Sequence, residues 1–281
     1  MTEPRTPPVG LNISETDRSA LRFFCRHLVG LCVTYRHRDS GHHEHLRFAA
    51  YSGTLIRVGD SILFLTAGHV LREVEAARQS AGVEIRDAVL ADTFGLRSAS
   101  GDQPIPFDLL GARLFYIDDE AAGLDFGVIV LSPYYVRLLA ANGMVALEED
   151  NWRRQHTVQF DGYAMLGFPE EFTSQRVDAL GAGLVSPTML SVRRLEVPPE
   201  GTPPTTYPRF IGEIDRRINI QSIRGMSGGP IFGFRLSPDV RYWVVAIQSS
   251  WLPSQRVVFG CSLPILASLM TEWEQAESSA L

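Results

Sequence analysis

The amino-acid sequence predicts an all-β fold, either an antiparallel barrel or a sandwich, because short apolar runs alternate with turn residues along most of its length. From Leu28 onward, β-branched and aromatic runs are separated by Gly, Asp and Ser, which is typical of many short strands joined by tight turns. Helical periodicity is confined to a few segments. The predicted strands cover residues 28–35, 49–58, 61–66, 126–131, 159–167, 230–234 and 242–249.

Helices are predicted near both ends of the chain and once in its interior. Ser14 can cap a short helix that runs to Cys25, since Ser is a favoured N-cap residue. An interior helix is predicted over 71–80, and a Pro at its first position marks a closing helix over 264–276.

The chain divides into five predicted segments, two of them rich in strands. Residues 186–209, which are rich in Pro and Thr, predict a long surface loop inside the second strand-rich half. The segments are an N-terminal extension (1–27), a first half (28–133), a linker without strand alternation (134–155), a second half (156–263), and a C-terminal helix and tail (264–281).

Composition and charge exclude several classes of function. The 281 residues are 45% hydrophobic and 21% charged, as in ordinary globular proteins. A net charge of −6 argues against a nucleic-acid partner, which would need a basic face. All 26 basic residues are Arg, so a Walker A loop, a Schiff-base lysine and a Ser–Lys dyad are excluded.

The N-terminal region predicts no secretory signal and no membrane contact. Its best apolar stretch, 20–33, is interrupted by Arg22, Arg26 and His27. No run in the chain approaches the ~18 apolar residues of a membrane helix. We therefore expect a cytoplasmic protein.

Metal and thiol chemistry are both disfavoured. The cluster His42-His43-Glu44-His45 fits a solvated loop better than a metal site, because adjacent side chains point apart. The three cysteines, Cys25, Cys32 and Cys261, form no CxxC pair, and so sparse and odd a set argues against a disulfide framework. Cys25 has no motif around it, and a buried cysteine usually acts as a small hydrophobe.

Two short segments place single polar residues beside predicted strands. In residues 64–70 (FLTAGHV), a strand ends in small residues and His69 follows, so that a loop histidine could approach a nucleophile from elsewhere in the chain. In residues 123–131 (GLDFGVIVL), Asp125 stands directly before an apolar strand, where a buried carboxylate could orient an imidazole. Taken alone, each has a plain structural alternative, because most histidines are structural and Asp commonly ends a turn.

A third segment, residues 224–232 (RGMSGGPIF), surrounds Ser227 with glycines and leads through Pro230 into a strand. Glycines permit positive φ and close backbone approach. In an inward-facing turn, the N–H groups of Gly225 and Ser227 could bind a developing oxyanion. The structural alternative is a Gly-rich β-turn.

Together, TAGH, LDFGVIVL and GMSGGP resemble the three motif blocks of the trypsin-like serine peptidases, and the order His69, Asp125, Ser227 is that of chymotrypsin-type enzymes. The resemblance covers roughly 28–269, including VVAIQSSW at 244–251, which is similar to the family's substrate-binding strand. It implies a chymotrypsin-like double antiparallel β-barrel, with His69 and Asp125 in a first barrel (28–133) and Ser227 in a second (156–263).

This resemblance implies a serine endopeptidase that acts on a protein or peptide substrate and needs neither a cofactor nor a metal. Ser227 would attack the scissile carbonyl, His69 would take its proton and Asp125 would orient His69. The Gly225 and Ser227 amides would form the oxyanion hole.

The sequence also departs from the secreted members of that family. Met226 stands where those enzymes have an Asp that pairs with a newly cut N-terminus, so activation by that ion pair is not expected, and the chain more resembles disulfide-free bacterial members. Gln221 lies at the expected floor of the S1 pocket, which implies a neutral P1 side chain. The expected walls of that pocket are Ser249, Ser250, Trp251 and Gly260.

Other functions stay open at this point. GMSGG also fits the nucleophile elbow of α/β-hydrolases, but that fold needs a His after the Ser, and all seven His precede Ser227. The chain could instead be a catalytically weak or inactive protease-fold binding or scaffold module, with 79–115 or 186–216 holding a partner or blocking the cleft. It could also be an enzyme that is latent until a regulatory protein partner binds.

Overall fold

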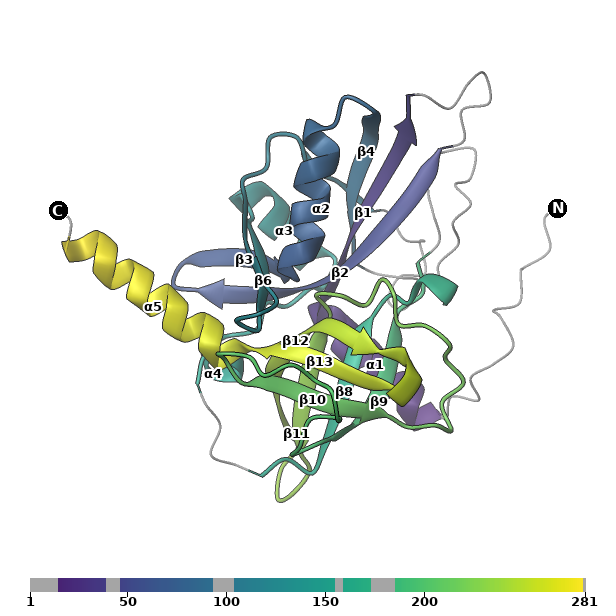
Figure 1. Ribbon diagram of the computed structural model, residues 1–281. Helices are drawn as coiled ribbons and strands as arrows, with labels where there is room; N and C mark the ends of the chain where they lie inside the picture. The colour runs from purple at the N-terminus through teal and green to yellow at the C-terminus, as the bar shows by residue number, and fades with distance from the viewer. Residues whose placement is uncertain (1–14, 39–45, 93–103, 155–158, 173–184, 280–281) are drawn as a thin grey trace.

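The computed structural model describes residues 15–38, 46–92, 104–154, 159–172 and 185–279. The predicted all-β fold class is confirmed, because two antiparallel sheets hold most of the regular secondary structure in the described residues and helices are few. The first sheet lies above the second in Figure 1, and the two pack against each other at the middle of the molecule.

The first sheet has seven strands and is built from the N-terminal half of the chain. Among the described residues β5 and β6 are its edge strands, so the hydrogen bonding there does not close this sheet on itself. Helix α2 (Gly68–Gln79) packs on β6 and β7. In spatial order the strands are β5 (Ile105–Pro106), β4 (Val83–Ala91), β1 (Leu28–His37), β2 (Arg47–Val58), β3 (Ser61–Thr66), β7 (Leu124–Val130) and β6 (Leu114–Asp119).

The second sheet is a closed six-stranded barrel. Its order around the barrel is β10 (Arg209–Ile214), β13 (Val257–Ser262), β12 (Arg241–Leu252), β11 (Pro230–Arg235), β8 (Gly162–Gly167) and β9 (Thr188–Arg194). Every strand pair in it is antiparallel, and full closure leaves no exposed sheet edge.

The connections differ from the sequence expectations in one place, over residues 186–209. The predicted linker 134–155 contains most of helix α3 (Pro133–Ala141) and all of helix α4 (Glu149–Trp152). Residues 186–209 are not one long loop, because β9 runs through them; Thr188, Leu190 and Val192 face inward on alternate positions. Of the prolines that suggested a loop, Pro187 directly precedes β9, and the others lie beyond its end.

The helices at the two ends of the chain contact different parts of the molecule. Helix α1 (Glu15–Phe24) and the 3-10 turn η1 (Cys25–His27) bring Phe24 against Phe232, Phe234 and Tyr242 of the barrel. Helix α5 (Leu263–Ser279) follows β13 directly and extends away from the barrel in Figure 1. None of the helices that the structure describes combines the length and apolar character needed to cross a bilayer.

A shared hydrophobic core joins the two sheets. One cluster takes Leu28, Ile56 and Leu65 from the first sheet together with Phe232 and Ile247 from the barrel, all of them fully buried. Each sheet also has a cluster of its own. Because close-packed interiors resist displacement, the shared cluster fixes how the two halves face each other.

All three cysteines are free and buried. The absence of a disulfide framework stays a prediction. The His42–His45 segment lies outside the described residues.

Candidate active site

His69 lies in the first turn of α2, not on the loop that its sequence context predicts. Ala67 is the extended N-cap residue of the helix, which begins at Gly68. Gly68 packs against the Ile117 carbonyl so closely that a side chain at this position would overlap it. A glycine therefore lets the helix start directly at the end of β3, and this start fixes the position of His69.

Asp125, the second residue of β7, holds His69 at two points. Its Oδ1 accepts the His69 backbone N–H at 2.8 Å, and its Oδ2 lies 2.8 Å from His69 Nδ1. N–H groups in the first turn of a helix have no partner within the helix, so the carboxylate satisfies one of them. It also places negative charge at the positive end of the helix dipole.

The pKa of each member of this pair is shifted by the other. Burial alone would raise the pKa of Asp125, but the hydrogen bond and charge of His69 and the hydrogen bond from Ser249 outweigh it and lower that pKa. An ionised carboxylate only accepts hydrogen bonds, so Nδ1 of a neutral His69 must donate and Nε2 is left as an acceptor. Burial would lower the pKa of His69, but Asp125, with smaller contributions from Glu73 and Asp118, raises it.

Ser227 lies on a glycine turn between β10 and β11. Gly225 and Gly228 have φ of 86° and 83°, a region that L side chains rarely adopt. A side chain at Gly228 would also overlap Thr66 Oγ1 and the Ser52 carbonyl oxygen. The turn therefore needs glycine at both positions, and this is how it can dock against β2 and β3 of the other half.

Three successive carbonyls in this turn are held in place. The Arg224 oxygen accepts the Glu170 N–H at 2.7 Å, and the Met226 oxygen accepts the Gly229 N–H at 2.8 Å. Between them, the Gly225 oxygen accepts the Ser52 hydroxyl at 2.8 Å. Because a trans peptide is planar, fixing a carbonyl also fixes the N–H on the opposite side of the same plane.

In the Ser227 turn, two of the four N–H groups from Gly225 to Gly228 donate a hydrogen bond to a described residue and two do not. The Met226 N–H donates to Ile223 and the Gly228 N–H to Gln248. Within the described part of the chain, the N–H groups of Gly225 and Ser227 make no hydrogen bond. These are the two donors that the sequence predicts for an oxyanion hole.

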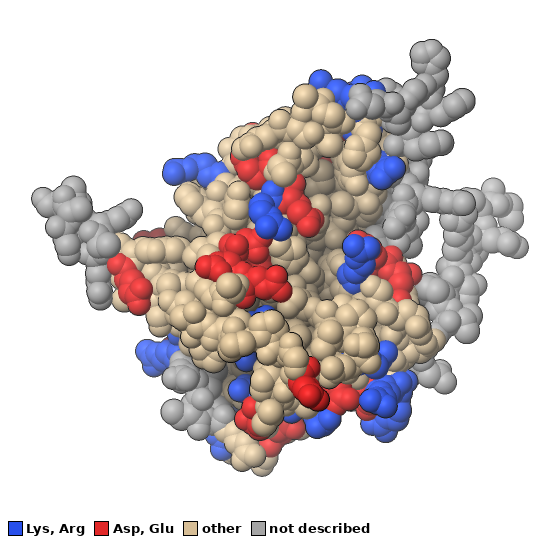
Figure 2. Space-filling model, viewed as in Figure 1, with Lys and Arg blue, Asp and Glu red and all other residues tan. Residues whose placement is uncertain are grey.

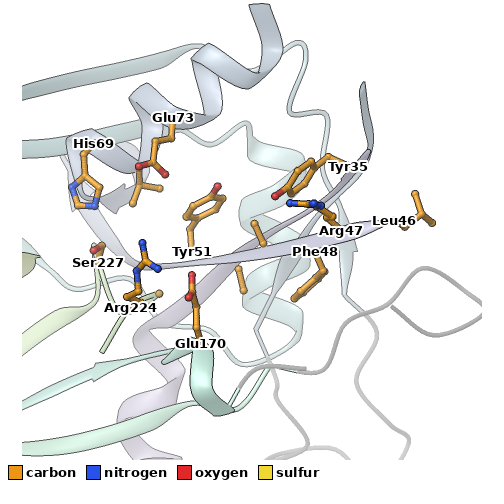
Figure 3. Close-up of a pocket in the computed structure, with 14 residues that line it drawn as sticks. Tyr35, Leu46, Arg47, Phe48, Tyr51, His69, Glu73, Glu170, Arg224 and Ser227 are labelled. Carbon is orange, nitrogen blue, oxygen red and sulfur yellow. The ribbon is translucent and has the colours of Figure 1, made fainter. Parts of the chain in front are cut away.

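A cavity of about 790 Å³ joins His69 to Ser227. Figure 3 shows both at one end of it, with Tyr51, Glu73 and Arg224 nearby. Among the described residues, His69 makes no hydrogen bond to Ser227. The other lining residues are Tyr35, Leu46, Arg47, Phe48, Ala49, Ala50, Val70, Glu170 and Gly225.

The residues predicted for the S1 pocket do not line this cavity. Ser249 donates from Oγ to Asp125 Oδ2 at 2.6 Å, so its side chain contacts the carboxylate that holds His69. Gln221 is exposed, with its N–H directed at the Glu171 carboxylate. Gly260 is paired with Gln248 inside the barrel. None of these, nor Ser250 or Trp251, lines the cavity beside Ser227, and their role in substrate binding stays a prediction.

Charge on the molecule is mixed. Figure 2 shows acidic and basic side chains close together on the face that it displays, rather than a wide patch of one sign. Among the described residues, no group of three or more His, Cys, Asp or Glu side chains is arranged to hold a metal ion.

No protein-family model matches this chain, and no curated protein matches it. Among solved structures it is similar to a thermostable serine protease, AL20, from an extremophilic microorganism, with 15% identity over 84% of this chain and 90% of that one and a TM-score of 0.42. A Glu endopeptidase in complex with MPD is 12% identical over 89% and 91%, with a TM-score of 0.44. A catalytically inactive tobacco etch virus protease complexed with substrate is 12% identical over 86% and 83%, with a TM-score of 0.36.

Proposed function

We propose that the chain is a serine endopeptidase that cleaves peptide bonds through Ser227, His69 and Asp125. The observation that carries this proposal is the doubly bonded Asp125–His69 pair facing a cavity shared with Ser227. The two open N–H groups beside Ser227 support it independently.

In the proposed acylation step, Ser227 Oγ attacks the substrate carbonyl carbon while His69 Nε2 takes the hydroxyl proton. The carbonyl π electrons move to oxygen, and the resulting oxyanion accepts hydrogen bonds from the Gly225 and Ser227 N–H groups. When the tetrahedral intermediate collapses, the C–N bond breaks and His69 returns the proton to the leaving amine.

The proposed deacylation step repeats this chemistry with water. His69 takes a proton from water, whose oxygen attacks the acyl-enzyme carbonyl, and the proton then passes to Ser227 Oγ as the ester bond breaks. The negative charge of Asp125 stabilises the imidazolium form of His69 in both steps.

The absence of a Ser227–His69 hydrogen bond among the described residues favours a second, narrower proposal. A regulatory protein partner that brings these two side chains together would raise a low resting activity. The catalytic bonds of serine nucleophiles often tighten only when substrate binds, so substrate alone could have the same effect.

Labelling with a fluorophosphonate probe tests the proposed function, with Ser227→Ala as the matched control. We expect the probe to label the wild-type chain and not the variant. Equal labelling of both would place the nucleophile elsewhere. Labelling of neither, together with no cleavage of a peptide library, would favour the binding or scaffold module.

A further inference from the structure

Ser52, in the middle of β2, is a completely buried serine that belongs to none of the sequence motifs. It lies in the first sheet, yet its hydroxyl bonds only to backbone groups of the second half of the chain. An inference about its role rests on the proposed function, because it concerns the turn that carries Ser227.

The two hydrogen bonds of Ser52 define where its hydroxyl proton points. The Phe168 N–H donates to Ser52 Oγ at 2.9 Å, and Ser52 Oγ donates to the Gly225 oxygen at 2.8 Å. An N–H can only donate, so Ser52 must use its own hydrogen for Gly225. A side chain at Gly167 would crowd this hydroxyl and Met226, so the hydroxyl is also sterically confined.

The backbone conformation at Gly225 depends on the hydrogen bonds of the peptide planes before and after it. Its φ of 86° and its lack of a side chain leave the backbone on either side free to rotate. The Glu170 N–H fixes the peptide plane before it through the Arg224 oxygen, and Ser52 fixes the plane after it through the Gly225 oxygen. The plane before Gly225 carries the Gly225 N–H, and the plane after it carries the Met226 N–H. Because the Met226 oxygen is held as well, the hydrogen bond from Ser52 completes the restraint of the backbone between the Gly225 and Ser227 N–H groups.

We propose that Ser52 is a positioning residue for the oxyanion hole: its buried hydroxyl, contributed by the opposite half of the molecule, holds the Gly225–Met226 peptide plane, which lies between the planes that carry the Gly225 and Ser227 N–H groups. Ser52 does not touch the substrate. It acts through Gly225, so its effect falls on the step in which negative charge develops on the carbonyl oxygen.

Thr54 provides a matched control on the same strand. It is as fully buried as Ser52, and its hydroxyl also donates to a backbone carbonyl, that of His27 at 2.7 Å. Thr54→Val and Ser52→Ala therefore each remove one buried hydroxyl that donates to a backbone carbonyl, and Ser52→Ala also removes the acceptor of the Phe168 N–H. Only Ser52→Ala frees the turn of Ser227.

The kinetic test compares wild type, Ser52→Ala, Ser52→Cys and Thr54→Val on one peptide substrate. Direct removal of an oxyanion-hole donor lowers kcat by roughly 10²–10³-fold. For the indirect effect of Ser52→Ala we expect a loss of about tenfold to a hundredfold in kcat with little change in KM, and a matching loss of affinity for a peptide aldehyde. Ser52→Cys, which keeps a weak donor, should recover part of the rate. A Ser52→Ala variant within about twofold of wild type, or an equal loss in Thr54→Val, would overturn the proposal.

A spectroscopic test decides the question without any turnover. Arg224–Gly225 is the only Arg–Gly pair in the sequence, so ¹³C-carbonyl Arg combined with ¹⁵N-Gly selects the Gly225 amide alone in an NMR spectrum. We expect its signal to shift and broaden in Ser52→Ala and to stay in place in Thr54→Val. An unmoved, sharp signal in Ser52→Ala would contradict the proposal. If the wild type neither reacts with fluorophosphonate nor cleaves peptides, the proposed function fails while this signal still tests Ser52.

Discussion

The two halves of the molecule contribute different kinds of groups to the candidate site. The first sheet supplies an Asp125–His69 pair that is already hydrogen-bonded, and so provides side chains in a fixed orientation. The barrel supplies Ser227 on a turn in which the surrounding backbone carbonyls are tied down. One half is therefore suited to moving a proton, and the other to carrying a nucleophile and stabilising charge on oxygen.

Each half also reaches across to orient what the other contributes. Ser249 of the barrel donates to Asp125 of the first sheet, while Ser52 of the first sheet donates to Gly225 of the barrel turn. Because each half supplies a hydroxyl that orients a group of the other half, neither half forms the complete candidate site by itself. The following predictions separate the contributions, beginning with the largest expected effect.

Ser227→Ala should remove the nucleophile that the barrel provides. We expect kcat to fall by roughly 10⁴–10⁶-fold, because the variant has no hydroxyl at position 227 to attack the carbonyl. The melting temperature should stay nearly unchanged, since the half-buried Ser227 side chain makes no hydrogen bond among the described residues. Steady-state kinetics and thermal unfolding check the two parts, and substantial residual activity would reject Ser227.

Asp125→Asn should disable the contribution of the first sheet by a smaller factor. The amide can present its N–H₂ to Nδ1 and so favour the wrong tautomer of His69, and we expect kcat to drop by about 10³–10⁴-fold. Asp118→Asn is the matched control, because Asp118 is the residue opposite Asp125 on β6 and pairs with Arg72 instead. Comparable losses of kcat in both variants would mean that catalysis depends on negative charge near α2 rather than on the Asp125–His69 hydrogen bond.

Ser249→Ala tests the hydroxyl that crosses from the barrel. Removing a donor to a buried carboxylate weakens the orientation of His69, and we expect kcat to fall by about tenfold, in line with hydrogen bonds to charged groups. Ser250→Ala serves as the comparison, since the sequence assigns both serines to substrate binding. A change in KM rather than kcat for Ser249→Ala would restore that original assignment.

Glu73→Gln should produce the smallest effect, a change in pH dependence only. Catalysis requires neutral His69, so the rate falls as the pH drops through the pKa of this group. That pKa is raised by Asp125 and, to a smaller extent, by Glu73, so removing the Glu73 charge should move the acid limb to lower pH with the plateau rate unchanged. A pH–rate profile measures this, with Glu75→Gln as the control because Glu75 is paired with Arg78 on the same helix. An acid limb that stays in place would mean that Glu73 does not act on His69.

The sequence predicted the all-β class and the order His69, Asp125, Ser227, because glycine turns and apolar strands leave clear local signals. It could not predict that His69 lies in the first turn of a helix, since this depends on how Gly68 packs against Ile117 on β6. It also gave no sign of Ser52, whose role depends on a contact between residues 173 positions apart. The substrate pocket, the segment boundaries and the cytoplasmic location stay predictions.

The burial of the three cysteine side chains predicts how the protein responds to thiol reagents. Burial raises the pKa of both Cys32 and Cys261 to about 12. Cys261 lies in the hydrophobic core shared by the two sheets, and its thiol is 3.3 Å from the Gly123 oxygen. At neutral pH these groups are protonated and shielded, so they react slowly with alkylating reagents. Since all three cysteines are free, millimolar dithiothreitol or iodoacetamide should leave the melting temperature and any hydrolysis unchanged. The same preparation can then be studied under reducing and oxidising conditions.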